Sequence, residues 1–163
     1  MITQFLLLAL TYIMVTLNVG DTAPNFKVVS TDGTIISLDQ YKGKNVILYF
    51  YPEDMTGGCT FEACSFRDDK AKFEVLNTVI LGVSLDDQKM HKEFTEKDHL
   101  NFPLLVDEGG KICAAYGVPL EENRYPHRWT FIIDKNSKIA KIYEKVAVRV
   151  HSEELQKDIT MLP

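Results

Sequence analysis

Two of the three cysteines lie five residues apart, Cys59 and Cys64, and the third, Cys113, lies far downstream. A cysteine thiolate is both a nucleophile and a redox group, so this pattern points to thiol chemistry. Gly57 and Gly58 come directly before Cys59 and allow the backbone a tight bend. The alternatives are inert: a small buried apolar residue at Cys59, and a bystander on a helix at Cys64.

The expected surroundings of Cys59 favour a charged sulfur. Residues 45–50 (NVILYF) form a continuous apolar run typical of a strand buried on both faces, and we expect a helix over residues 59–76. Cys59 would then open this helix, where backbone N–H groups are unpaired and the helix dipole is positive. Both effects stabilise a thiolate, and the same N–H groups could bind an oxygen ligand.

The spacing of Cys59 and Cys64 sets a mechanical condition on any reaction between them. It is not the C-x-x-C of dithiol exchange motifs or of paired zinc ligands. On an intact helix, five residues separate the two Cα atoms by about 8.6 Å. A disulfide tolerates a Cα separation of up to ~7 Å. If the two cysteines react with each other, the first turns of the helix must therefore unwind.

Strands and helices alternate around this segment. Short strands are predicted at residues 26–30, 34–37, 45–50, 79–84, 104–106, 129–133 and 139–144. Helices are predicted at residues 59–76 and 111–116. A further helix would run from caps at Asp86-Asp87 to about residue 97, and a last one would follow a cap at Ser152. A loop is expected between Pro119 and Pro126. The first two strands form a hairpin, and the whole pattern predicts an α/β sandwich with parallel and antiparallel pairs in one sheet.

Composition limits the class of protein. The chain has 163 residues, which suits one domain, and its hydrophobic fraction of 45% is that of a globular protein. Its 18 Lys and Arg against 23 Asp and Glu give a net charge of −5, which argues against nucleic-acid binding. Three cysteines cannot all pair in disulfides. We therefore expect a single globular domain with thiol function.

Residues 1–19 carry no charged side chain, and an apolar run extends from Phe5 to Leu17. This run is short for a membrane-spanning helix, which needs roughly 17–25 apolar residues. Three interpretations stay open: a translation start at Met14 or a dispensable extension, a retained membrane anchor, and a cleaved signal. We therefore expect a domain at residues 18–163 behind an extension at 1–17. We expect it in the cytoplasm, with export or membrane anchoring through residues 1–17 as the alternatives.

Other reactive residue types have ordinary explanations. Cys113 reads as a thiol in the core of a helix. His91 and His99 lie among charged residues and are expected on the surface. The histidines are scattered, so no zinc site is expected.

Several segments resemble peroxiredoxins, and in particular their Q-type branch, the bacterioferritin-comigratory-protein-like enzymes. The matching segments are residues 20–26 (GDTAPNF), 50–64 (FYPEDMTGGCTFEAC), 128–134 (RWTFIID) and 150–154 (VHSEE). The second segment contains the P-x-x-x-T-x-x-C core of that family. The resemblance extends from residue 18 to about residue 160.

This resemblance implies a thioredoxin-like fold, with a mixed central sheet flanked by helices and an N-terminal β-hairpin. It implies an antioxidant enzyme that reduces hydrogen peroxide and organic hydroperoxides. Cys59 would attack the peroxide and become a sulfenic acid, and Cys64 would resolve it as an intramolecular disulfide. Thioredoxin or a similar dithiol protein would regenerate the enzyme. No metal, haem or flavin cofactor is expected.

The resemblance also assigns roles to residues around the nucleophile. Thr56 would offer its hydroxyl to the peroxide and the thiolate, and Arg128 would keep the thiolate charged and polarise the O–O bond. Pro52 would shield the site from water. The amide of Gly58, with that of the nucleophile itself, would bind a peroxide oxygen, and Glu62 would orient Arg128.

One residue departs from the family pattern, because Gly57 stands where proline is common. Glycine widens the range of backbone conformations, so we expect easier local unfolding, faster disulfide formation and less over-oxidation. The competing outcome is a looser site that reacts more slowly. Two other functions stay open: a one-cysteine peroxidase that uses an external thiol, and a redox sensor or relay that oxidises a partner protein. The resemblance further implies a monomer.

Overall fold

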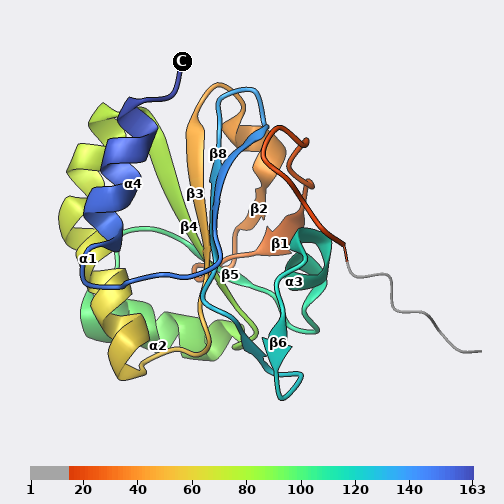
Figure 1. Cartoon of the computed structure of the whole chain (residues 1–163). Coiled ribbons are helices and arrows are strands. Elements are labelled where there is room, and N and C mark those ends of the chain that lie inside the picture. Colours follow the sequence, from red (N-terminus) through yellow and green to blue (C-terminus); the bar gives the residue numbers. More distant parts are fainter. Residues whose placement is uncertain (1–14) are drawn as a thin grey trace, which may run out of the picture.

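The computed structural model describes residues 15–163, and its centre is a five-stranded mixed sheet in the order β5-β4-β3-β8-β9 (Figure 1). The strands are β3 (Asn45–Phe50), β4 (Thr78–Ser84), β5 (Leu104–Val106), β8 (Thr130–Ile133) and β9 (Ile139–Tyr143). β3 pairs in parallel with β4, and β4 with β5, whereas β8 is antiparallel to both β3 and β9. The predicted mixed sheet is therefore confirmed.

Helices cover the two faces of this sheet unequally (Figure 1). One face packs against α1 (Gly57–Val75), α2 (Gln88–Asp98) and α4 (His151–Thr160). The other carries α3 (Lys111–Tyr116) and the N-terminal hairpin of β1 (Lys27–Val29) and β2 (Ile35–Ser37), which a short 3-10 helix, η1 (Leu38–Tyr41), follows. The predicted N-terminal hairpin is thus present.

Strand β3 explains why the molecule has a core on each side of the sheet. Because successive side chains of a strand point to opposite faces, Val46, Leu48 and Phe50 enter the core beneath α3. Ile47 and Tyr49 enter the core beneath α1. All five are at most 1% exposed, so the continuous apolar run is buried on both faces, as predicted.

Several element boundaries differ from those predicted. Helix α1 begins at Gly57, two residues before the expected start, because Thr56 is its N-cap. Ser152 does not cap α4. Val150 holds that position, and the Ser152 hydroxyl instead donates to Asp69 Oδ2 at 2.7 Å. The predicted loop between the two prolines contains a small hairpin, β6 (Leu120–Glu121) with β7 (Tyr125–Pro126).

The prediction that His91 lies on the surface was wrong, because its side chain is completely buried. His91 lies three residues before Phe94, so both point from the same face of α2 into the core. The polar ring is tolerated there because both of its nitrogens lie within 3.0 Å of oxygen acceptors. The opposite face of α2 is charged and solvated, and His99 at its end is exposed, as predicted.

The predicted extension at residues 1–17 lies outside the described residues up to residue 14. Of the part that is described, Leu17 packs against the core beneath α3. Within residues 15–163, no helix combines the length and apolar character that crossing a membrane requires. The three interpretations of the N-terminal segment remain predictions.

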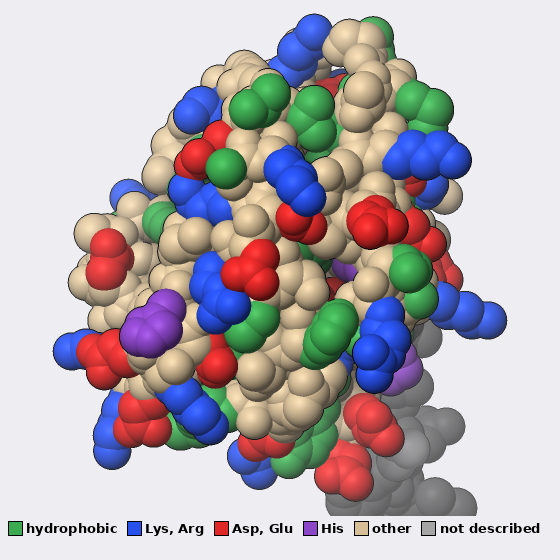
Figure 2. Space-filling view, turned by 90° about the vertical axis from the view of Figure 1, so that its left-hand side faces the viewer, with side chains coloured by type: hydrophobic (Ala, Val, Ile, Leu, Met, Phe, Trp, Pro, Cys, Tyr) green, Lys and Arg blue, Asp and Glu red, His purple; other side chains and the backbone are tan. Residues whose placement is uncertain are grey.

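The face formed by α1, α2 and α4 is polar (Figure 2). Lys, Arg, Asp and Glu side chains cover it with both signs interspersed, and hydrophobic side chains lie singly among them. Single apolar side chains of this kind are normal on the surface of a monomeric protein.

Candidate active site

Cys59 lies where strand β3 passes into helix α1. The strand ends at Phe50, a loop follows, and Cys59 is the third residue of the helix rather than its first. The Thr56 side chain makes no capping hydrogen bond, so the N–H groups of Gly57, Gly58 and Cys59 have no protein partner in the first turn. The thiol itself is 2% exposed. A buried sulfur therefore faces a helix end with free hydrogen-bond donors.

Arg128 reaches this thiol from the sheet. The backbone beside it is fixed, because Phe50 N donates to Trp129 O at 2.8 Å and continues the β3–β8 pairing. Side chains alternate along a strand, so Arg128 points to the same face as Thr130 and Ile132, which is the face that α1 covers. Trp129 points to the other face and packs against the opposite core.

The guanidinium of Arg128 joins the sulfur to a buried carboxylate. Its Nη2 donates to Cys59 Sγ at 3.2 Å, and its Nη1 donates to Glu62 Oε2. A Cβ atom at Gly58 would stand 3.4 Å from Nη2, in van der Waals contact with the guanidinium, so Gly58 lies beside Arg128. Four predicted site residues, Cys59, Gly58, Glu62 and Arg128, are thus brought together by the fold.

Burial and charge oppose each other at Glu62. Its side chain is 1% exposed, and this burial raises the pKa of Glu62 to about 7, although the charge and hydrogen bond of Arg128 act to lower it. At Arg128, burial lowers the pKa, but the negative charges of Glu62 and Cys59 outweigh it and the net direction is upward. The guanidinium therefore stays charged beside the sulfur.

Thr56 and Pro52 occupy the loop between β3 and α1. The Thr56 hydroxyl donates to the carbonyl oxygen of Glu53 at 3.3 Å, which leaves its oxygen lone pairs free to accept a hydrogen bond. Pro52 is half-buried and lines a groove of about 260 Å³ together with Arg124 and Tyr125. Arg124 in turn lies 3.7 Å from Glu53, so the small β6–β7 hairpin borders the loop.

Cys64 lies on the same unbroken helix as Cys59 and has different neighbours. It is half-buried, and its Sγ is 4.0 Å from Asp98 Oδ1, at the end of α2. Burial is the main reason that the pKa of Cys64 is raised. Both thiols are free. The fold therefore does not bring the two sulfurs together, and the condition that the helix must unwind stands.

Cys113 is separated from this site by the sheet. It is 1% exposed in α3 and belongs to the core on the opposite face from Cys59. Burial raises the pKa of Cys113 far above that of a free thiol, and the nearby Asp107 adds to the effect. The prediction that Cys113 is a thiol in the core is confirmed by its position.

A network beside the loop escaped the sequence analysis. The ligand atoms of Asp54, Asp86 and His91 lie within 4.8 Å of one another, a grouping that could suit a metal ion. Each is instead committed to hydrogen bonds within the protein, including His91 Nε2 to the carbonyl of Leu105 at 3.0 Å. The one sequence signal was Asp54 itself, an acidic residue close behind a buried strand.

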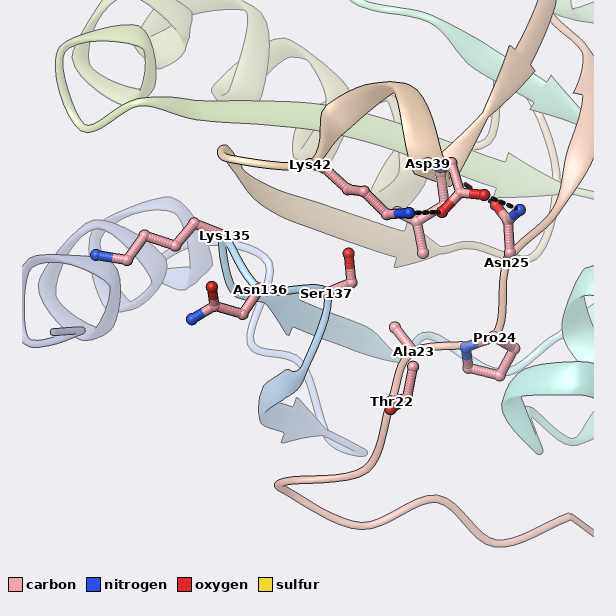
Figure 3. A pocket seen from close by; sticks show the side chains of 10 residues that line it. Thr22, Ala23, Pro24, Asn25, Asp39, Lys42, Lys135, Asn136 and Ser137 are labelled. Atoms are coloured by element: carbon pink, nitrogen blue, oxygen red, sulfur yellow. Dashed lines mark hydrogen bonds and ion pairs between the residues drawn. The ribbon is translucent and has the colours of Figure 1, made fainter.

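Another pocket, with a volume of about 630 Å³, lies away from this site (Figure 3). Its lining includes Asn25, Lys42, Lys135 and Ser137. Lys42 precedes β3 and Lys135 follows β8, so this pocket lies at the end of the sheet opposite to Cys59. It does not adjoin the sulfur of Cys59.

Comparisons with known proteins point to one family. The model of the AhpC/TSA family matches residues 19–142. Peroxiredoxin Bcp of Bacillus subtilis is 44% identical over 145 residues, which cover 85% of this chain and 92% of that protein.

Solved structures give the same result. The chain matches a crystal structure of a PrxQ mutant from Xylella fastidiosa with a TM-score of 0.83 and 32% identity, covering 88% of this chain and 95% of that one. It matches peroxidoxin BcpB from Mycobacterium tuberculosis with a TM-score of 0.82 and 29% identity, covering 89% and 97%. The expected thioredoxin-like α/β fold is therefore confirmed.

Proposed function

This chain belongs to the AhpC/TSA family, among the thiol peroxidases named peroxiredoxin Bcp and Q, and from this premise we propose a two-cysteine catalytic cycle that begins at Cys59. Its substrates are hydrogen peroxide and organic hydroperoxides. The single observation that carries the proposal is the hydrogen bond from Arg128 Nη2 to Cys59 Sγ at 3.2 Å, at the free N-terminus of α1.

In the first step the thiolate of Cys59 attacks the terminal oxygen of the hydroperoxide. An S–O bond forms, the O–O bond breaks, and the leaving alkoxide takes up a proton to become an alcohol, or water from hydrogen peroxide. Arg128 and the free N–H groups of Gly58 and Cys59 stabilise the charge on the oxygens. The Thr56 lone pairs accept the hydrogen bond of the hydroperoxide O–H. Pro52 restricts the access of water.

Glu62 supports this step indirectly. Because it binds the other arm of the Arg128 guanidinium, it fixes the plane in which Nη2 meets the sulfur. An arginine held by two partners loses little further freedom when the peroxide arrives. Glu62 is therefore a positioning residue in this proposal.

In the second step the thiol of Cys64 attacks the Cys59 sulfenic acid. A disulfide forms and water leaves. Because the intact helix holds the two Cα atoms about 8.6 Å apart, the first turn of α1 unwinds before the sulfurs meet. Gly57 and Gly58 lower the cost of this opening because glycine is a poor helix former.

In the third step a dithiol protein, thioredoxin or one like it, reduces the disulfide. Its two thiols become a disulfide, and Cys59 and Cys64 regain their protons. The cycle needs no metal or organic cofactor. We further propose that the enzyme works as a monomer in the cytoplasm, with export or membrane anchoring through residues 1–17 as the alternative.

Thiol accounting tests the cycle directly. The reduced protein receives one equivalent of hydrogen peroxide, is blocked with a maleimide, and is analysed by intact mass and peptide mapping. We expect the loss of two thiols and a linked peptide that joins Cys59 to Cys64. If Cys59 is found as a sulfenic acid and the Cys64 thiol is intact, the two-cysteine cycle is wrong and the one-cysteine alternative applies. Three intact thiols after seconds of exposure would overturn peroxidase function.

A second measurement separates an enzyme from a relay. Multiple turnovers of peroxide with thioredoxin, thioredoxin reductase and NADPH support the proposed cycle. Slow turnover together with a trapped mixed disulfide to another protein would favour the redox relay.

A further inference from the structure

The loop between β3 and α1 is fastened by a buried polar group that the proposed cycle does not use. Asp54 is 4% exposed and lies five residues before Cys59. Its carboxylate accepts a hydrogen bond from Tyr51 Oη at 2.7 Å, and its other oxygen lies 2.7 Å from His91 Nδ1. Its backbone N–H donates to Asp86 Oδ2 at 2.9 Å. We call these contacts of Asp54 the loop anchor.

The partners of His91 require two protons, one on Nε2 and one between Nδ1 and Asp54. Nε2 lies 3.0 Å from the carbonyl oxygen of Leu105, which can only accept, and Nδ1 faces the carboxylate of Asp54. One proton is therefore held between Nδ1 and the Asp54 carboxyl group, which form an ion pair when the proton is on the ring, and the His91 side chain is completely buried. A buried ion pair of this kind contributes little net stability because of its desolvation cost, yet it fixes one geometry.

The backbone directly after Asp54 is strained. Met55 takes a φ of +59°, a left-handed conformation in which its Cβ is crowded by the following carbonyl. Thr56 then returns to an extended conformation as the N-cap of α1. A strained residue persists only where its surroundings fix it from both sides. The loop anchor holds one side of Met55, and helix α1 holds the other.

We propose that Asp54 and His91 are positioning residues for the peroxidase reaction. Their ion pair sets the loop conformation that keeps Thr56 and Cys59 in the active site. When the pair loses the proton between them, the loop anchor loses its His91 contact and the first turn of α1 opens more often. The effect on rate rests on the proposed function, whereas the effect on the loop does not.

The charged and titratable groups that face the His91 ring come from three segments. They are Asp54 in the loop, Tyr51 at the end of β3, and Asp86 between β4 and α2. Burial alone lowers the pKa of His91, but the hydrogen bond and charge of Asp54, helped by Leu105 and Asp86, outweigh it and the net direction is upward. The His91 contact of the anchor is therefore fully formed below the ordinary imidazole pKa of about 6.5, and it is lost as pH rises through the higher pKa of His91 in the folded protein.

Asp54→Asn is the discriminating variant. An asparagine amide N–H can donate to Nδ1 of a neutral His91, while its oxygen still accepts from Tyr51. The anchor would then hold at high pH and fail at low pH, when the ring becomes protonated, which is the reverse of the wild type. His91→Gln removes the ion pair at every pH. The matched control is His99→Asn, an exposed histidine of the same segment whose φ of +51° asparagine tolerates.

Two readouts are compared from about pH 6 to pH 9, each as a ratio to the His99→Asn control, so that the titration of the reacting thiol cancels. They are amide hydrogen exchange at residues 55–60 and the stopped-flow rate of Cys59 oxidation by hydrogen peroxide. We expect His91→Gln to speed the exchange and to slow oxidation about 10- to 100-fold, the cost of a small misplacement. We expect Asp54→Asn to invert the pH dependence of both ratios.

If the exchange ratio and the oxidation ratio depend on pH in the same way in Asp54→Asn and in the wild type, the proposal is overturned. The proposal would also be overturned if His91→Gln lowered global stability but left amide exchange at residues 55–60 and the rate of Cys59 oxidation equal to those of the His99→Asn control. A wild-type chain that consumes no peroxide, yet shows the expected exchange, would overturn the proposed function and support the loop anchor.

Discussion

Arg128 donates a hydrogen bond to the sulfur of Cys59 at 3.2 Å, although 69 residues separate them in the sequence. The same guanidinium binds Glu62 through its other arm. The segment that leads into β8 supplies the arginine, and helix α1 supplies both the sulfur and the carboxylate. The contact between the guanidinium and the sulfur thus depends on how α1 packs on the sheet.

Replacing Arg128 by lysine should slow the reaction of Cys59 with hydrogen peroxide by about 100- to 1000-fold, the usual cost of one lost oxyanion donor. Lysine keeps a positive charge but cannot bind the sulfur and Glu62 with one rigid fork. Stopped-flow kinetics at several peroxide concentrations give the second-order rate constant. Arg149→Lys, at an exposed arginine, is the matched control. If Arg128→Lys and Arg149→Lys react with hydrogen peroxide at equal rates, Arg128 has no role in the attack on peroxide.

Glu62→Gln should stabilise the reduced protein more at pH 8 than at pH 5. The folded-state pKa of about 7 lies above the ordinary value of 4.5, so the folded form favours the protonated acid. In the wild type, the stability that comes from protonated Glu62 is fully present below pH 4.5 and is lost as pH rises through 7, a change of up to about 3 kcal/mol. Glutamine stays neutral, so the variant does not lose this stability at high pH. Urea unfolding at both pH values measures the difference, with the exposed Glu96→Gln as control. A difference that does not change with pH contradicts the prediction.

Gly57→Pro should slow disulfide formation without slowing the attack on peroxide. Gly57 is the first residue of α1, a position that favours proline, and a Cβ there meets no atom within 4 Å. Thr56 already has the extended conformation that a following proline requires. A stabilisation of about 0.4–1 kcal/mol corresponds to opening that is about two- to five-fold rarer. Stopped-flow fluorescence separates the attack on peroxide from disulfide formation. An unchanged rate of disulfide formation would contradict the prediction.

The same variant should be over-oxidised more readily. A sulfenic acid that waits longer for Cys64 meets a second peroxide more often and becomes sulfinic acid. Intact mass after a titration with excess peroxide measures the sulfinic fraction. A fraction equal to that of the wild type would mean that opening of α1 does not limit resolution.

Cys64→Ser should trap the oxidised enzyme at the sulfenic acid. Peroxide would still react with Cys59 at the wild-type rate, but turnover with thioredoxin would fall to the background. Dimedone labelling followed by peptide mapping locates the trapped sulfenic acid. Cys113→Ser is the control, because its buried thiol lies across the sheet and should leave turnover unchanged. Full turnover in Cys64→Ser would move the resolving thiol outside the chain.

Local patterns predicted the elements that depend on their own residues. The run at residues 45–50 identified β3 within its observed bounds, because a strand buried on both faces is apolar throughout. Asp87 caps α2 through its side chain, as its residue type indicated. The start of α1 was placed too late because a Gly-Gly pair is a poor helix former, whereas in a first turn it needs no intrahelical N–H partner.

The sequence by itself predicted Cys59 as the nucleophile, determined the mixed sheet and, through a resemblance, indicated the set of residues around Cys59. These follow from residue type, periodicity and motif order, which are properties of short segments. Only the tertiary structure decided that the guanidinium of Arg128 meets the sulfur and that His91 is buried against Asp54. Such contacts join segments tens of residues apart, and their geometry depends on how the helices pack on the sheet, which no local pattern encodes.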